Sequence, residues 1–119
     1  MTLDMAKRDA DRVLGAKLFR GLGDQTRLAI LQLLAGGERR VTDLVAELGM
    51  SQSNVSGHLS CLKDCGLVGD RPEGRAVYYR IASGDVFGLL RAAETLLGDV
   101  GHQIALCPNY VAGDQSPLR

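Results

Sequence analysis

The 119-residue sequence has no excess of either charge: 14 lysines and arginines balance 14 aspartates and glutamates, so the formal net charge is zero. This excludes nucleic-acid binding through overall positive charge, because phosphate neutralisation then has to come from locally clustered cations. The basic residues that could form such clusters are Arg39 and Arg40, Lys63, and Arg71, Arg75 and Arg80. Taken alone, such a cluster is more often only a solvated face.

The chain also lacks a long apolar run near its N-terminus, where residues 1–11 are charged. This argues against a signal peptide or a transmembrane helix and predicts a cytoplasmic protein with no membrane partner. Its three cysteines are an odd number, and structural disulfides are disfavoured in the cytosol, so we expect reduced thiols. A Gly-rich phosphate loop and a plausible Cys-His-acid set are absent as well, and an enzyme is not expected.

What the sequence does contain is a series of helical segments with recognisable ends. We expect helices over about residues 5–21, 24–34, 43–48, 51–65 and 85–103. Asp24, Thr42 and Ser51 are placed to act as N-caps, and Gly49 is placed to stop the third helix. Two short helices separated by residues 49–52 are typical of a helix-turn-helix, in which the second helix reads DNA.

The segment after these helices fits an antiparallel hairpin. Leu67-Val68 leads into a turn at 71–75, and residues 76–81 return as a β-prone strand. Beside a helix-turn-helix, such a hairpin is a wing, and Arg71 and Arg75 at its tip are placed for phosphates.

The first and last helices carry more apolar surface than a small domain needs, and a dimer would bury it. The expected fold class is mainly α with a β-hairpin wing. It is a winged helix-turn-helix that forms a homodimer through its N- and C-terminal helices. We expect residues 1–103 to form this DNA-binding and dimerisation domain and residues 104–119 to form a C-terminal tail.

The fourth helix is the most informative segment. Val55, Leu59 and Leu62 recur at i, i+4 and i+7 and predict its buried stripe. A neighbouring stripe consists of Asn54, His58, Cys61 and Cys65. The outward stripe is small and polar, which suits contact with base edges. The residues predicted to contact DNA here are Gln52, Ser53, Ser56, Gly57 and Ser60.

Cys61 and Cys65 are spaced so that both thiolates can bind one metal ion. Positions i and i+4 of a helix place Cβ atoms roughly 5–6 Å apart, a span that two thiolates can close onto one ion. Thiolate ligands favour soft ions over magnesium, calcium or manganese. The alternative is that both cysteines are small buried hydrophobes near a helix end.

Three motifs in this order resemble the ArsR/SmtB-type transcriptional regulators. They are Leu22-Gly23-Asp24-Gln25-Thr26-Arg27-Leu28-Ala29-Ile30-Leu31, then Ser53-Asn54-Val55-Ser56-Gly57-His58-Leu59, then Gly74-Arg75-Ala76-Val77-Tyr78-Tyr79. The second is similar to the family's recognition helix and the third to its wing. The resemblance covers about residues 18–97 and implies a dimeric winged-helix repressor. Such a repressor leaves double-stranded operator DNA when an inducer binds.

The family's sensing sites vary, and two of them are absent here. Arg40 and Thr42 stand where one site has cysteines, and residues 85–87 lack the histidine of the zinc site on the last helix. What is left is Cys61 and Cys65 with the tail residue Cys107, which resembles the CmtR-like cadmium and lead sensors. In those sensors the third thiolate comes from the C-terminal region of the partner subunit.

The resemblance implies Cd(II) or Pb(II) as the inducer, held by Cys61, Cys65 and Cys107. Zn(II) is a further candidate if water or His102 completes its shell. The sequence leaves open whether Cys107 acts within its own subunit or across the dimer, and whether His58 joins the site. An alternative with the same fold is a thiol-redox sensor, which requires a thiol of low pKa.

Overall fold

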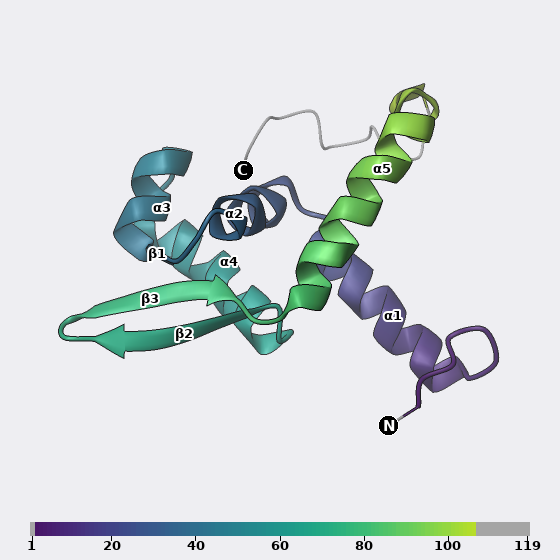
Figure 1. Cartoon of the computed structure of the whole chain (residues 1–119), viewed down its shortest axis with the longest axis horizontal. Helices are drawn as coiled ribbons and strands as arrows, with labels where there is room; N and C mark the ends of the chain where they lie inside the picture. Colours follow the sequence, from purple (N-terminus) through teal and green to yellow (C-terminus); the bar gives the residue numbers. More distant parts are fainter. Residues whose placement is uncertain (1, 107–119) are drawn as a thin grey trace.

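The computed structural model describes residues 2–106 of the chain. This part of the protein contains five helices and three strands (Figure 1). In chain order they are α1 (Asp9–Leu22), α2 (Gln25–Ala35), β1 (Arg39–Arg40), α3 (Val41–Leu48), α4 (Gln52–Asp64), β2 (Val68–Glu73), β3 (Ala76–Ile81) and α5 (Gly84–Leu106). The mainly helical fold with a β-hairpin agrees with the predicted winged helix-turn-helix.

The core is built from α2, α3, α4 and the sheet, with further apolar side chains packed around its edge. Its most enclosed apolar side chains have no exposed surface: Ile30, Leu31, Leu44, Val55 and Leu59. Leu62 is 1% exposed, so the predicted buried stripe of α4 is confirmed. Burial of one such side chain stabilises a fold by about 1.5–3 kcal/mol, and this stripe therefore determines which face of α4 is left outside.

The turn between α3 and α4 depends on two residues predicted from the sequence. Gly49 ends α3 with φ 65°, a left-handed conformation that glycine adopts without steric cost. Ser51 caps α4, where its Oγ accepts a hydrogen bond from the backbone N–H of Asn54 at 3.2 Å. Both predictions are confirmed, and these residues set the direction in which α4 leaves α3.

The start of α3 differs from the prediction. The N-cap is Arg40 rather than Thr42, and the helix begins at Val41. The carboxylate of Asp43 accepts a hydrogen bond from the backbone N–H of Arg40 at 3.0 Å, as the acidic residue of a capping box does. Strand β1, which the sequence did not predict, holds Arg40 in register with Tyr78 of β3.

The strands form an antiparallel sheet in the order β1-β3-β2, and β2 and β3 make the predicted hairpin. The turn is shorter than predicted because β2 continues to Glu73, and Gly74 takes a φ of 62° directly after it. Arg71 lies within β2, in register with Tyr78. The prediction that Arg71 lies at the wing tip was therefore wrong, whereas Arg75 does lie there.

Helix α1 begins at Asp9 rather than near residue 5, because the preceding residues fold back along it. The backbone N–H of Asp4 donates to the Asp11 carboxylate at 2.7 Å, and Met5 Sδ occupies the space that a Cβ on Gly15 would need. In Figure 1, α1 and α5 extend on the side away from the wing tip. Among the described residues, no helix combines the length and apolar character needed to span a bilayer.

Candidate nucleic-acid interface and metal centre

The outward face of α4 carries the residues predicted to contact DNA. Gln52, Ser53, Gly57 and Ser60 are exposed, and Ser56 is half-buried. Ser53 Oγ lies 3.4 Å from Ser51 Oγ, and a Cβ on Gly57 would meet nothing within 4 Å. The side chains of Gln52, Ser56 and Ser60 have no hydrogen-bond partner within residues 2–106. These groups are therefore available for hydrogen bonds to base edges.

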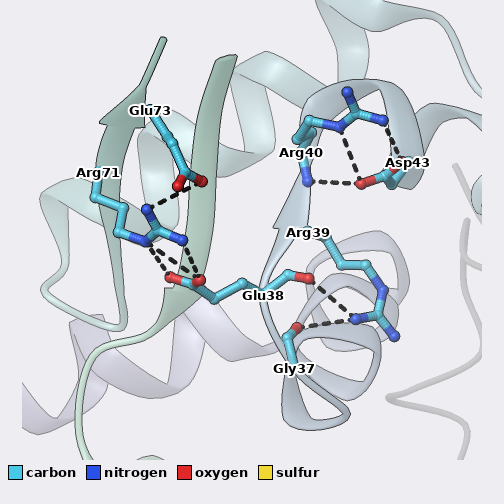
Figure 2. Close-up of polar contacts among 7 residues, drawn as sticks. All are labelled: Gly37, Glu38, Arg39, Arg40, Asp43, Arg71 and Glu73. Atoms are coloured by element: carbon cyan, nitrogen blue, oxygen red, sulfur yellow. Dashed lines mark hydrogen bonds and ion pairs between the residues drawn. The ribbon is translucent and has the colours of Figure 1, made fainter.

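The guanidinium of Arg71 lies between two carboxylates (Figure 2). Its Nη2 is 2.8 Å from Glu38 Oε1, and its Nη1 is 3.3 Å from Glu73 Oε2. The guanidinium also lies over the Tyr78 ring, 5.0 Å from the ring centre. The hydrogen bonds with Arg71 lower the pKa of Glu38, and those same bonds raise the pKa of Arg71. Arg71 therefore ties the wing to the segment before β1.

Arg75 has different surroundings at the wing tip, where it is exposed and makes no ion pair within the described part of the chain. It lines a concavity of about 420 Å³ between the starts of α3 and α4 and the wing. The full lining is Arg40, Val41, Thr42, Gln52, Arg75, Ala76 and Val77. This concavity combines two cationic side chains with an outward residue of α4, which suits a phosphate group beside the bases.

Arg40 also lines this concavity, although the sequence did not predict a DNA contact for it. Arg40 is one of several basic residues in the sequence. Its place in β1, in register with Tyr78 of β3, brings it to the concavity that Arg75 also lines. Its Nη2 lies 3.4 Å from Asp43 Oδ1, so its charge is partly offset (Figure 2). The sequence signal that could have indicated this role is the pair Arg39 and Arg40, shortly before the expected start of the third helix.

Cys61 and Cys65 lie at the C-terminal end of α4 as free thiols, Cys61 half-buried and Cys65 exposed. They are one helical turn apart, and the backbone N–H of Cys65 donates to the carbonyl of Cys61 at 3.1 Å. Partial burial raises the pKa of the Cys65 thiol, and the charge and hydrogen bond of Cys61 raise it further, against a lowering by Arg27. The two thiols therefore sit on successive turns of one helix end.

The rest of the predicted ligand set is incomplete among the described residues. Between residues 2 and 106, no group of three or more His, Cys, Asp or Glu side chains is arranged to hold a metal ion. Cys107, the predicted third ligand, lies outside the described residues. Nδ1 of His58 faces Arg27 Nη1 at 3.4 Å and Asp24 Oδ2 at 3.8 Å. The cysteine pair by itself offers two sulfur donors on adjacent turns, which fits a soft ion.

A second concavity of about 430 Å³ lies between α1, α2 and α5 and is almost entirely apolar. It is lined by Phe19, Leu22, Gly23, Leu28, Leu89, Leu90, Ala93, Leu96 and Leu97. Phe19, Leu96 and Leu97 are each more than half exposed. Apolar surface on these terminal helices is what the predicted dimer contact requires.

Known proteins share this fold and much of this sequence. A family model described as "Bacterial regulatory protein, arsR family" matches residues 24–69. The "Probable mercury resistance operon repressor" of Streptomyces lividans is 40% identical over 92 residues, which are 77% of this chain and 74% of that protein. The "HTH-type transcriptional regulator CmtR" of Mycobacterium bovis is 51% identical over 67 residues, 56% of this chain and 57% of CmtR.

The fold comparison agrees with the sequence comparison. The solution structure of the homodimeric winged helix-turn-helix DNA-binding domain Mb0332 of Mycobacterium bovis superimposes with a TM-score of 0.68 at 37% identity. It covers 84% of this chain and 92% of that domain. The predicted winged helix-turn-helix class is therefore confirmed, and the relatives named here are regulators rather than enzymes.

Proposed function

The chain belongs to the ArsR family of bacterial regulatory proteins, and on this premise we propose that it is a metal-responsive transcriptional repressor. In this proposal a homodimer binds double-stranded operator DNA and leaves it when cysteine thiolates bind a soft metal ion. The relative named as a mercury resistance operon repressor supports a repressor of a metal-resistance operon, and the relative named CmtR supports a transcriptional regulator.

The observation that carries the proposal is the placement of the thiols on the helix that bears the outward polar face. Cys61 directly follows Ser60, the last of the predicted DNA contacts on α4, and Cys65 is the C-cap residue of the same helix. A signal at the thiols therefore acts on the body that carries the DNA contacts. Small changes in dimer geometry matter for DNA binding, because half-sites lie about 34–36 Å apart and both recognition helices have to reach them.

For the metal site, we propose Cys61 and Cys65 as two thiolate ligands and Cys107 as the third. A bound soft ion supplies the charge that keeps these thiolates deprotonated. Three sulfur donors without a fourth protein ligand favour Cd(II) or Pb(II), with Zn(II) as a further candidate because structural zinc usually takes four ligands.

For the DNA surface, we propose that the outward residues of α4 contact base edges in the major groove. These residues are Gln52, Ser53, Ser56, Gly57 and Ser60. The charged concavity of Arg40 and Arg75 supports a phosphate contact beside them. Arg71 is a weaker candidate for such a contact, because Glu38 and Glu73 already offset its charge.

For the dimer, we propose contact through α1 and α5. The apolar concavity between these helices and the exposed side chains of Phe19, Leu96 and Leu97 support it. The homodimeric structure of Mb0332, which aligns with 84% of this chain, supports the same assembly.

The test is a titration of Cd(II) into the reduced protein bound to its own promoter DNA. Thiolate–metal absorbance follows binding, and fluorescence anisotropy of the labelled DNA follows release. We expect about three thiolates to bind per subunit and the DNA to dissociate as the site fills. DNA binding that responds to neither Cd(II) nor Pb(II) would contradict the proposal.

The redox alternative has less support from the thiol environment. A redox-sensing cysteine requires a stabilised thiolate, whereas the pKa of Cys65 is raised by partial burial and by Cys61. The same titration separates the two functions, since a redox sensor would release DNA with peroxide and not with cadmium.

A further inference from the structure

Arg27 of α2 connects three parts of the molecule near the thiol pair. Its Nε donates to the carbonyl of Gly21 at 2.5 Å, and its Nη2 donates to the carbonyl of Arg20 at 3.3 Å. Its Nη1 lies 3.4 Å from Nδ1 of His58 on α4. One planar guanidinium therefore joins the C-terminal end of α1 to the recognition helix.

The base of this bridge is held in place by the N-cap of α2. Oδ2 of Asp24 accepts a hydrogen bond from the backbone N–H of Arg27 at 3.0 Å and lies 3.8 Å from His58 Nδ1. The side chains of His58 and Asp24 are only 17% and 20% exposed. The contact is thus largely shielded from water, where an arginine fork holds several acceptors in a fixed geometry that lysine cannot reproduce.

The thiol pair meets this bridge at Gly21. Sγ of Cys65 lies 3.7 Å from the position that a Cβ on Gly21 would take. Gly21 is buried, and its carbonyl is one of the two that Arg27 holds. The same helix carries Phe19, whose exposed side chain lines the apolar concavity of the proposed dimer contact. Cys65, Gly21 and Arg27 therefore form a continuous path between the thiols, the proposed dimer helix and α4.

We propose that Arg27 is the positioning residue that couples the thiol pair to the orientation of the DNA-reading helix α4 against α1. It fixes α4 to the end of α1 through His58, and a change at Cys65 reaches this bridge through Gly21. This rests on the proposed function, since it names the residues that transmit the release signal. In this proposal Arg27 determines how much the DNA affinity of the metal-free protein differs from that of the metal-loaded protein. It does so without itself contacting the DNA or the metal ion.

The test compares Arg27→Lys, which keeps the charge and loses the fork, with the wild type. Operator affinity is measured with and without Cd(II), and thiolate absorbance gives the Cd(II) affinity. Couplings of this kind are typically about 5–150-fold. We expect the ratio of the two operator affinities to fall to a few-fold or less in Arg27→Lys, while the Cd(II) affinity of the DNA-free protein changes little. His58→Gln removes the other end of the bridge, and we expect the same loss.

Arg12→Lys is the matched control, because Arg12 is an exposed arginine of α1 whose side chain, within residues 2–106, hydrogen-bonds only to Asp9 and the carbonyl of Ala6. It is expected to keep the wild-type ratio. Wild-type coupling in both Arg27→Lys and His58→Gln would overturn the proposal.

A second readout separates this proposal from the metal function. Because the Arg27 contacts join α4 to the buried Gly21 that Cys65 packs against, we infer that operator DNA bound to α4 also changes the packing of Cys65. We therefore expect operator DNA to change the rate at which iodoacetamide alkylates Cys65 in the wild type and to change it much less in Arg27→Lys. If cadmium leaves wild-type DNA binding unchanged but this difference persists, the metal function fails and the coupling stands. An equal effect of DNA in the two proteins overturns the coupling.

Discussion

The outward polar face of α4, from Gln52 to Ser60, and the C-terminal end of the helix differ in what their side chains contact. Gln52, Ser56 and Ser60 have no hydrogen-bond partner within residues 2–106, and the space beyond Gly57 is open. At the other end, Sγ of Cys65 lies 3.7 Å from the position that a Cβ on Gly21 of α1 would take, so this end of α4 packs against another helix. Both regions lie on one 13-residue helix about 20 Å long, so a displacement of the whole helix at its packed end also moves the open face, whereas a small local change at one end need not reach the other.

The largest effect is expected for Cys65→Ser, which changes the packed end of α4 alone. Serine keeps the size of the side chain and removes a soft donor, so we expect operator binding to remain and release by Cd(II) to be lost. The expected coupling is close to 1, compared with about 5–150-fold for typical couplings. Anisotropy of labelled operator DNA measures both affinities. Release of the variant at wild-type cadmium concentrations would show that the packed end does not hold the metal.

The second prediction changes the open polar face of α4 and leaves the thiols intact. Ser56→Asp places a negative charge on the face proposed to enter the groove, where juxtaposed like charges cost several kcal/mol. We expect operator affinity to fall by roughly tenfold or more, while thiolate absorbance on adding Cd(II) stays as in the wild type. Gln32→Glu adds the same charge at an exposed site of α2 and serves as the control. Equal losses in both variants would mean that net charge, not this face, determines the affinity.

The features of α4 that the sequence predicted depend on neighbours along the chain. Its buried stripe follows from helical periodicity, and its start follows from Ser51, whose partner is three residues away. The left-handed Gly49 is likewise a local requirement. The helix-turn-helix could therefore be predicted before any tertiary contact was known.

The features that were wrong or missed depend on contacts between distant segments. β1 consists of two residues that become a strand only by pairing with β3, and this pairing moved the start of α3 to Val41. Arg71 lies within β2 and hydrogen-bonds to Glu38, which is far away in sequence. The bridge of Arg27 ends on two backbone carbonyls and on His58, and no residue pattern signals such a contact.

The two wing arginines extend the same contrast between open and occupied groups. Arg75 has no ion-pair partner among the described residues, whereas Arg71 is held by Glu38 and Glu73. The logarithm of the DNA affinity falls linearly with the logarithm of the salt concentration. Loss of one phosphate contact makes this negative slope shallower by about 0.9. We expect this change for Arg75→Ala and a smaller one for Arg71→Ala, measured by anisotropy over a salt series. Equal changes would mean that Arg71 leaves its carboxylates to contact DNA.

Two glycine replacements provide the mildest test, because each adds one methyl group to an α-helix. Replacing a glycine inside a helix by alanine typically stabilises it by about 0.5–1 kcal/mol. A methyl on Gly57 would extend into open space, and one on Gly21 would lie in ordinary contact, 3.7 Å from Cys65 Sγ. We therefore expect Gly57→Ala to raise the melting temperature slightly and Gly21→Ala at least to preserve it.

Their functional effects should separate along α4. Gly57→Ala is expected to change operator affinity a few-fold and to leave the alkylation rate of Cys65 unchanged, because the added methyl lies on the open face. Gly21→Ala is expected to slow the alkylation of Cys65 and to leave the operator affinity of the metal-free protein unchanged. If both variants altered both properties, the two ends of α4 would not be separate sites, and the helix would respond as a whole to any added bulk.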